Sequence, residues 1–383
     1  MSMFLKRILR SRLINYNPEA LILLSFMTAI LIGTFLLKLP ISVQNGQTLS
    51  WVNAFFTATS ATCITGLGVI DIGTGLSFFG QIVVLVLIQI GGLGIMTLSL
   101  LFLMLLRRRS SLTTRSCLMS LSNEIDIKSI RGAVLKILSF TLTIELIGAG
   151  LLFLYLRNYH PTQTAIYSSV FHSISAFCNA GFSIYKENFL VFQRVPYVQI
   201  IAMVLAIIGG IGFVVISDFF HVFAPKKNGQ RKTLSSHSKM ALIGSGFLIV
   251  LGALVIWSFE RSEQLSAMPL WDQIMNALFL SSASRTVGFN ALDISLLSNA
   301  TLFFVVILMF IGGSPGSTAG GVKVNTVFVL LCFVVSQVKG STSTNFLKRK
   351  IPNDIVHKAA AIILISLVFV VLSVFVLQVT ESI

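Results

Sequence analysis

The sequence predicts an all-α polytopic membrane protein built from parallel repeats of one helical unit. Of its 383 residues, 55% are hydrophobic and only 11% are charged. Several apolar stretches have the length of about 20 residues that a helix needs to cross a bilayer. Three short segments along the chain also share one pattern of residues. Composition therefore indicates a lipid environment, and the repeats indicate the architecture.

The basic residues indicate how the chain is oriented. The net charge is +15, and 21 of the 28 Lys and Arg residues lie in residues 6–12, 107–136, 226–239 and 339–358. By the positive-inside rule, these four segments and the N-terminus are predicted to be cytoplasmic. No compact basic domain carries the charge, so we expect contact with membrane lipid and no nucleic-acid partner.

Each of three predicted units contains a glycine turn between a short helix and a long one. The turns are SATCITGL (60–67), SAFCNAGF (175–182) and SASRTVGF (282–289). The amphiphilic stretch before each turn is too short to span a bilayer. The apolar runs that follow contain IGGLG (90–94), IGGIG (208–212) and IGGSPG (311–316). The predicted units are 1–110, 111–225 and 226–340, with an incomplete fourth unit over 341–383.

This unit predicts a pore. Its order is a cytoplasmic start, a spanning helix, a short re-entrant helix, a glycine turn and a returning helix, and the basic linkers make successive units parallel. Non-helical backbone at membrane depth is tolerated only where protein or a water-filled cavity meets its polar groups. A glycine at positive φ can aim carbonyl oxygens at a shared axis, where they replace the hydration shell of a cation. The predicted architecture is therefore helix–pore loop–helix repeats around a central ion path, with three complete units and one helix of a fourth.

The glycine-rich stretch GGSPGSTAGG (312–321) interrupts the third returning helix. Five glycines and a proline disfavour a helix, and its hydroxyl side chains suit a wet cavity. The alternative is a cytoplasmic connector, but the apolar run 301–311 would then be too short to cross the bilayer. We call residues 312–321 the intramembrane loop.

Together, TCITGL, FCNAGF, SRTVGF and GGSPGSTAGGVK resemble the Trk/Ktr/HKT superfamily of potassium transporters, most closely the membrane subunit of Ktr-type systems. The resemblance covers essentially the whole chain. It implies that the substrate is the potassium ion and that each unit contributes one strand with a single glycine to a selectivity filter. The residues implied for the filter, here called the glycine strands, are Ile64, Thr65, Gly66, Asn179, Ala180, Gly181, Thr286, Val287 and Gly288.

The resemblance also implies a gate beneath the filter, formed by the intramembrane loop and the lysine that follows it. These residues are Gly312, Gly313, Ser314, Pro315, Gly316, Ser317, Thr318, Ala319, Gly320, Gly321 and Lys323. It implies further a homodimer in the bacterial plasma membrane and a cytosolic nucleotide-binding regulatory subunit on the basic face. The sequence itself shows only that this face is positive.

Other features have less specific interpretations. Arg285 is predicted to point behind its turn and to be paired, with an acid as a candidate partner, whereas Glu145 is either functional or a partner of Arg285 or Lys323. His172 is predicted to be a hydrogen-bonded core residue. The glycines of GGLG and GGIG are predicted to lie inside spanning helices, where small residues permit close packing. We find no nucleophile with a base nearby, no Walker motif and no metal-ligating cluster, so neither an enzyme nor a cofactor is expected.

The glycines of the three turns are 115 and 107 residues apart, so a fourth would fall at roughly residue 400, beyond Ile383. Two functions are therefore compatible with the sequence. One is a potassium-conducting subunit; the alternative is a truncated, non-transporting remnant or accessory subunit.

Overall fold

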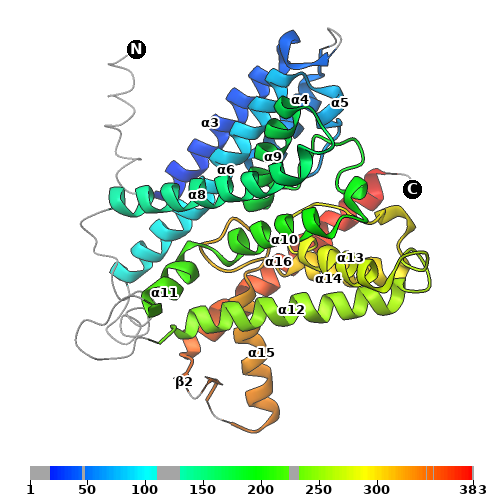
Figure 1. The fold of residues 1–383 in the computed structure, drawn as a ribbon. Coiled ribbons are helices and arrows are strands. Elements are labelled where there is room, and N and C mark those ends of the chain that lie inside the picture. Colours follow the sequence, from blue (N-terminus) through cyan, green and yellow to red (C-terminus); the bar gives the residue numbers. More distant parts are fainter. Residues whose placement is uncertain are drawn as a thin grey trace, which may run out of the picture.

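The computed structural model describes residues 18–44, 48–109, 130–223, 233–341, 343–347 and 349–381. Most of these residues are helical (Figure 1). The basic segment 6–12 and parts of the linkers 107–136 and 226–239 lie outside the described residues.

The first predicted unit contains one short helix between two long apolar ones. Its helices are α3 (Pro18–Lys38), η1 (Pro40–Ser42), α4 (Trp51–Thr62), α5 (Ile72–Gly75) and α6 (Phe78–Arg109). Ser50 has an extended conformation and is the N-cap of α4, and its side chain accepts a hydrogen bond from Asn53 N over 3.1 Å. This cap fixes where the short helix begins.

The second predicted unit has the same order but a different final helix. Its helices are α8 (Ile130–Leu156), α9 (Thr162–Phe177), η4 (Leu190–Phe192), α10 (Pro196–Ile211) and α11 (Phe213–Phe223). The axes of α10 and α11 differ by 92° across Gly212. The prediction that IGGIG lies inside one continuous spanning helix is therefore wrong.

In the third predicted unit, the intramembrane loop interrupts the returning helix and divides it into α14 and α15. Its helices are α12 (Ser236–Glu260), α13 (Leu270–Ala283), η5 (Ile294–Leu296), α14 (Asn299–Phe310) and α15 (Val324–Val338). A two-stranded antiparallel hairpin, β1 (Asn345–Phe346) and β2 (Arg349–Lys350), then leads to α16 (Asn353–Thr380). Figure 1 shows α15 running in a different direction from α14 and α12, so the loop separates two helices of different direction.

Length and hydropathy support a multi-pass membrane protein. Within the described residues, four helices are long and apolar enough to span a bilayer, and the bent pair α10–α11 would make a fifth. Large apolar side chains remain exposed on the outer helices, whereas much of α9 and α13 is buried. Lipid can cover the outer side chains, so the apolar exterior and the buried short helices are both expected of a polytopic protein.

The main core joins the first two units around their short helices and also includes residues of the third unit. Phe171 and Phe177 of α9 are fully buried, and Gly91 of α6 lies so close to α4 that a Cβ there would stand 2.2 Å from Thr62 O. Close packing through IGGLG is therefore confirmed. This packing holds the C-terminal ends of α4 and α9 in place, and the glycine strands start at those ends.

Candidate ion filter and intramembrane loop

The three glycine strands share an unusual backbone conformation. In each, the glycine and the residue two positions before it have positive φ. The φ values are 57° and 80° for Ile64 and Gly66, 57° and 69° for Asn179 and Gly181, and 72° and 86° for Thr286 and Gly288. Left-handed residues that alternate with ordinary ones turn successive peptide carbonyls toward the same side of a strand. A β-branched residue such as Ile64 or Thr286 adopts positive φ only where its surroundings impose it.

Backbone hydrogen bonds hold each strand against the end of its short helix. Thr65 N donates to Ser60 O and Ala180 N donates to Ser175 O, both over 2.8 Å. In the third strand, Gly288 N donates to Ala283 O over 3.2 Å. The Ser-Ala pair that begins each repeated segment therefore supplies the acceptor that closes the turn.

The three glycines, Gly66, Gly181 and Gly288, lie close together although they are far apart in the sequence. A Cβ on Gly66 would stand 2.6 Å from Ala180 O, and one on Gly181 would stand 2.5 Å from Val287 O. A Cβ on Gly288 would lie 3.1 Å from the Cα of Gly181 and 3.9 Å from the Cα of Gly66. The strands thus converge around one point, and only glycine fits there.

The intramembrane loop leaves and rejoins the bundle at one place. Gly312 N donates to Val322 O over 3.0 Å, and Val322 N donates to Phe310 O over 3.1 Å. Between these ends, Ser314, Ser317 and Thr318 are almost completely buried. The two ends of the loop therefore lie together and its middle is packed inside the protein, whereas a connector in bulk water would be exposed.

The interrupted helix α10 supplies the acceptors that hold the loop. Ser314 N donates to Gly210 O over 2.9 Å and Thr318 N donates to Gly209 O over 3.2 Å. These carbonyls are free because α10 ends at Ile211 and the last carbonyls of a helix have no partner within it. Gly212 has φ +83° and a Cβ there would lie 2.6 Å from Gly316 O, so the loop and the break fit each other.

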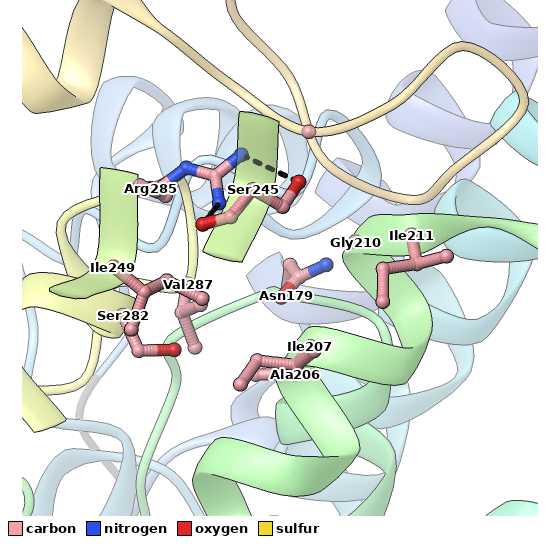
Figure 2. A pocket seen from close by; sticks show the side chains of 11 residues that line it. Asn179, Ala206, Ile207, Gly210, Ile211, Ser245, Ile249, Ser282, Arg285 and Val287 are labelled. Atoms are coloured by element: carbon pink, nitrogen blue, oxygen red, sulfur yellow. Dashed lines mark hydrogen bonds between the residues drawn. The ribbon is translucent and has the colours of Figure 1, made fainter. Parts of the chain in front are cut away.

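Arg285 joins the third glycine strand to the loop. Its guanidinium is buried and donates to Ser245 O and Ser245 Oγ over 3.3 Å and to Gly312 O over 2.8 Å. The expectation of a packed, buried side chain is confirmed, but in the described part of the chain these partners are oxygens of serine and backbone, not an acid. Together with Asn179 and Gly313, it lines a cavity of about 30 Å³ (Figure 2).

Glu145 lies elsewhere, on α8, with its side chain facing α6. Its carboxylate accepts from Gln89 Nε2 over 3.1 Å and lies 3.8 Å from the Sγ of Cys178. The interpretation of Glu145 as a partner of Arg285 or Lys323 is therefore wrong. Lys323 instead donates to Ala319 O, near the C-terminal end of the loop.

His172 is buried among polar and aromatic side chains. Its Nε2 lies 2.9 Å from Ser183 Oγ and its Nδ1 lies 2.7 Å from Ser168 O. These contacts confirm a hydrogen-bonded core histidine.

Comparison with known proteins assigns this architecture to a family. A family model described as TrkH, a cation transport protein, matches residues 19–382. The chain belongs to the TrkH family. It is 37% identical to the Ktr system potassium uptake protein B of Bacillus subtilis, with 96% of this chain and 82% of that protein covered. It is 33% identical to the potassium/sodium uptake protein NtpJ of Enterococcus hirae, with 99% and 82% covered.

A solved TrkH structure has the same fold. The potassium transporter TrkH from Vibrio parahaemolyticus matches with a TM-score of 0.71 at 21% identity, covering 92% of this chain and 72% of that one. Members of the TrkH family are cation transporters, which agrees with the expectation that this chain is not an enzyme.

Some features of this TrkH-family chain were not predicted. IGGLG and IGGIG differ at one residue, yet α6 continues through Gly94 whereas α10 breaks at Gly212. At the second motif the intramembrane loop packs against the break, since a Cβ on Gly212 would lie 2.6 Å from Gly316 O. The side-chain contact of Asn179 with Thr318 was also missed, because only a carbonyl contribution was predicted for Asn179.

Proposed function

We propose that this protein is the membrane subunit of a potassium uptake system and conducts K⁺ between the glycine strands, under the control of the intramembrane loop. The observation that carries the proposal is the convergence of Gly66, Gly181 and Gly288 from three distant segments, each preceded by a second residue with positive φ. Carbonyl oxygens on one side of several strands are the ligands that replace the water shell of a monovalent cation.

Relatives support potassium as the ion. Two similar proteins are named for potassium uptake or for potassium and sodium uptake. Backbone carbonyls select by number and spacing, so a change in strand geometry should alter the preference between the two ions.

The loop is proposed to act as the gate. The loop is buried and packs against the C-terminal end of α10, which also contacts Asn179 of the second glycine strand. Its small side chains permit movement without displacing a large packed group. Ser314 N donates to Gly210 O, Thr318 N donates to Gly209 O and Asn179 shares a hydrogen bond with Thr318, and each such bond typically contributes about 0.5–1.5 kcal/mol to holding the loop in place.

A regulatory partner is also proposed. The relatives named as Ktr system proteins indicate a system with more than one component. The basic linkers 107–136 and 226–239 offer a positive cytoplasmic face for a cytosolic nucleotide-binding subunit. We propose in addition that the membrane subunit is a homodimer in the plasma membrane with its N-terminus in the cytoplasm.

The test is potassium uptake by a bacterium that lacks its own uptake systems and depends on the chain at low external K⁺. Replacing Gly288 by Ser adds a Cβ at φ +86°, where three strands meet, and should abolish uptake or shift the preference toward Na⁺. Gly246→Ser is the matched control, because a Cβ at Gly246 meets nothing within 4 Å.

Unchanged K⁺ and Na⁺ fluxes in the Gly288 variant would show that these strands are not the filter. Absence of uptake by the unaltered protein, inserted normally together with its partner, would favour the accessory-subunit alternative.

A further inference from the structure

The second glycine strand differs from the other two in the side chain that precedes its central residue. The three equivalent positions hold Ile64, Asn179 and Thr286, all with positive φ. Ile64 has no polar group, and within the described residues the Thr286 hydroxyl has no hydrogen-bond partner. Asn179 is 1% exposed and its amide points out of the strand toward the intramembrane loop. The second strand thus has a side-chain link that the others lack.

The amide of Asn179 binds the loop and the broken helix together. It shares a hydrogen bond of 2.7 Å with Thr318 Oγ1. In the amide orientation that satisfies both of its ends, Oδ1 accepts from Thr318 Oγ1 and from Gly210 N (3.2 Å), and Nδ2 donates to Ala206 O (3.2 Å). Figure 2 shows the amide between Arg285 and the end of α10. The side chain of Asn179 therefore contacts both the intramembrane loop and the end of α10 against which the loop packs.

Thr318 completes the link from the loop side. Its backbone N donates to Gly209 O over 3.2 Å, and its hydroxyl also lies 3.2 Å from Phe177 O, the last residue of α9. Thr318 is 1% exposed. The residue of the loop that reaches the glycine strand is thus fixed through both its backbone and its side chain.

We infer that Asn179 is a positioning residue that latches the intramembrane loop to the second glycine strand through Thr318, so that loop opening and strand conformation are coupled. The inference rests on the proposed function for its effect on flux, but the latch itself is a structural contact. A coupling between two sites is reciprocal at equilibrium, so a loosened latch should change both loop opening and the affinity of the strands for K⁺.

Substitutions can remove the latch without altering the backbone of the strand. Asn179→Gly removes the amide and keeps the positive φ, which glycine adopts freely. Thr318→Val removes only the hydroxyl, and Thr318→Ser retains it. Thr141→Val is a matched control, because Thr141 is equally buried and its hydroxyl has no partner within the described residues.

The direct measurement is amide hydrogen exchange of the loop in purified protein in nanodiscs. Thr318→Val should raise exchange roughly 3- to 10-fold, the effect of one lost hydrogen bond, and Asn179→Gly should raise it at least as much, because it also loses the bonds to Gly210 and Ala206. The double variant should exchange more slowly than the product of the two single effects predicts, because both substitutions remove the bond between Asn179 and Thr318. Thr318→Ser and Thr141→Val should exchange like the unaltered protein.

Uptake per inserted molecule gives the second readout. The same two variants should raise uptake and shift its half-maximal K⁺ concentration, and Thr318→Ser should restore both. Loop exchange that is unchanged in both variants, or effects that multiply in the double variant, would overturn the latch. Faster exchange without any uptake by the unaltered protein would instead retain the latch and reject the proposed transport function.

Discussion

Arg285 Nη2 donates to the carbonyl oxygen of Gly312 over 2.8 Å, so the third glycine strand is bound to the first residue of the intramembrane loop. The same guanidinium is anchored on Ser245 of α12. Loop and strand are therefore held together in the third unit through a charged donor, as they are in the second unit through an amide.

Removing this donor should free the loop. Arg285→Met keeps the length of the side chain and loses the charge-assisted bond, which is worth about 1.5–3 kcal/mol, so we expect uptake per inserted molecule to rise about 10-fold or more. Arg285→Lys should give a smaller rise, because lysine keeps the positive charge although it cannot reach Ser245 and Gly312 together with a planar fork. Normal insertion with uptake at or below that of the unaltered protein would contradict the prediction.

Shortening the loop should open the pathway. Deleting Pro315–Ser317 leaves the closing bonds between Gly312, Val322 and Phe310 in place. If the loop obstructs the pathway, a shorter one cannot fill it, so flux should increase and should no longer depend on the regulatory partner. The measurement is uptake with and without the partner, divided by the amount of inserted protein. Lower flux together with lower membrane abundance would mean that the loop is only a structural connector.

The break in α10 should depend on Gly212. Gly212→Ala forces a side chain into φ +83° and against Gly316 O, so we expect a loss of about 1–2 kcal/mol or more in stability, measured as a lower unfolding temperature in detergent. Gly246→Ala is the control, since it adds a methyl group in open space within a helix and should be neutral or stabilising. Equal unfolding temperatures for the two variants would refute the role assigned to Gly212.

Docking of a regulatory subunit should depend on the basic linkers. Exchanging Lys226, Lys227, Arg231 and Lys232 for glutamates should reduce co-purification with the partner, and the reduction should be greatest at low salt, where charge attraction is least screened. Exchange of the same number of lysines and arginines in residues 348–358 tests whether the position of the charge matters. Undiminished co-purification after both exchanges would argue that these charges set only the orientation in the membrane.

The sequence predicted the features that depend on local chemistry. Apolar length predicted the membrane helices, and glycine with proline predicted the interruption after Phe310, because both effects act within a few residues. The break at Gly212 could not be predicted in this way, since it depends on Gly316, which lies 104 residues away in the sequence. The contact between Asn179 and Thr318 was missed for the same reason. The assignment of the glycine strands to a filter remains a prediction.

The break at Gly212 also has a mechanical consequence. Helix α11 begins directly after it and runs for 11 residues, about 16 Å, toward the basic linker. A Cβ on Gly316 would lie 3.1 Å from Val214, which is next to the break, whereas Phe223 is at the opposite end of α11. If α11 rotates about Gly212, Val214 beside the loop moves through a shorter arc than Phe223 at the far end of the helix. A given movement of the far end would then reach Gly316 as a smaller displacement with a proportionally larger force.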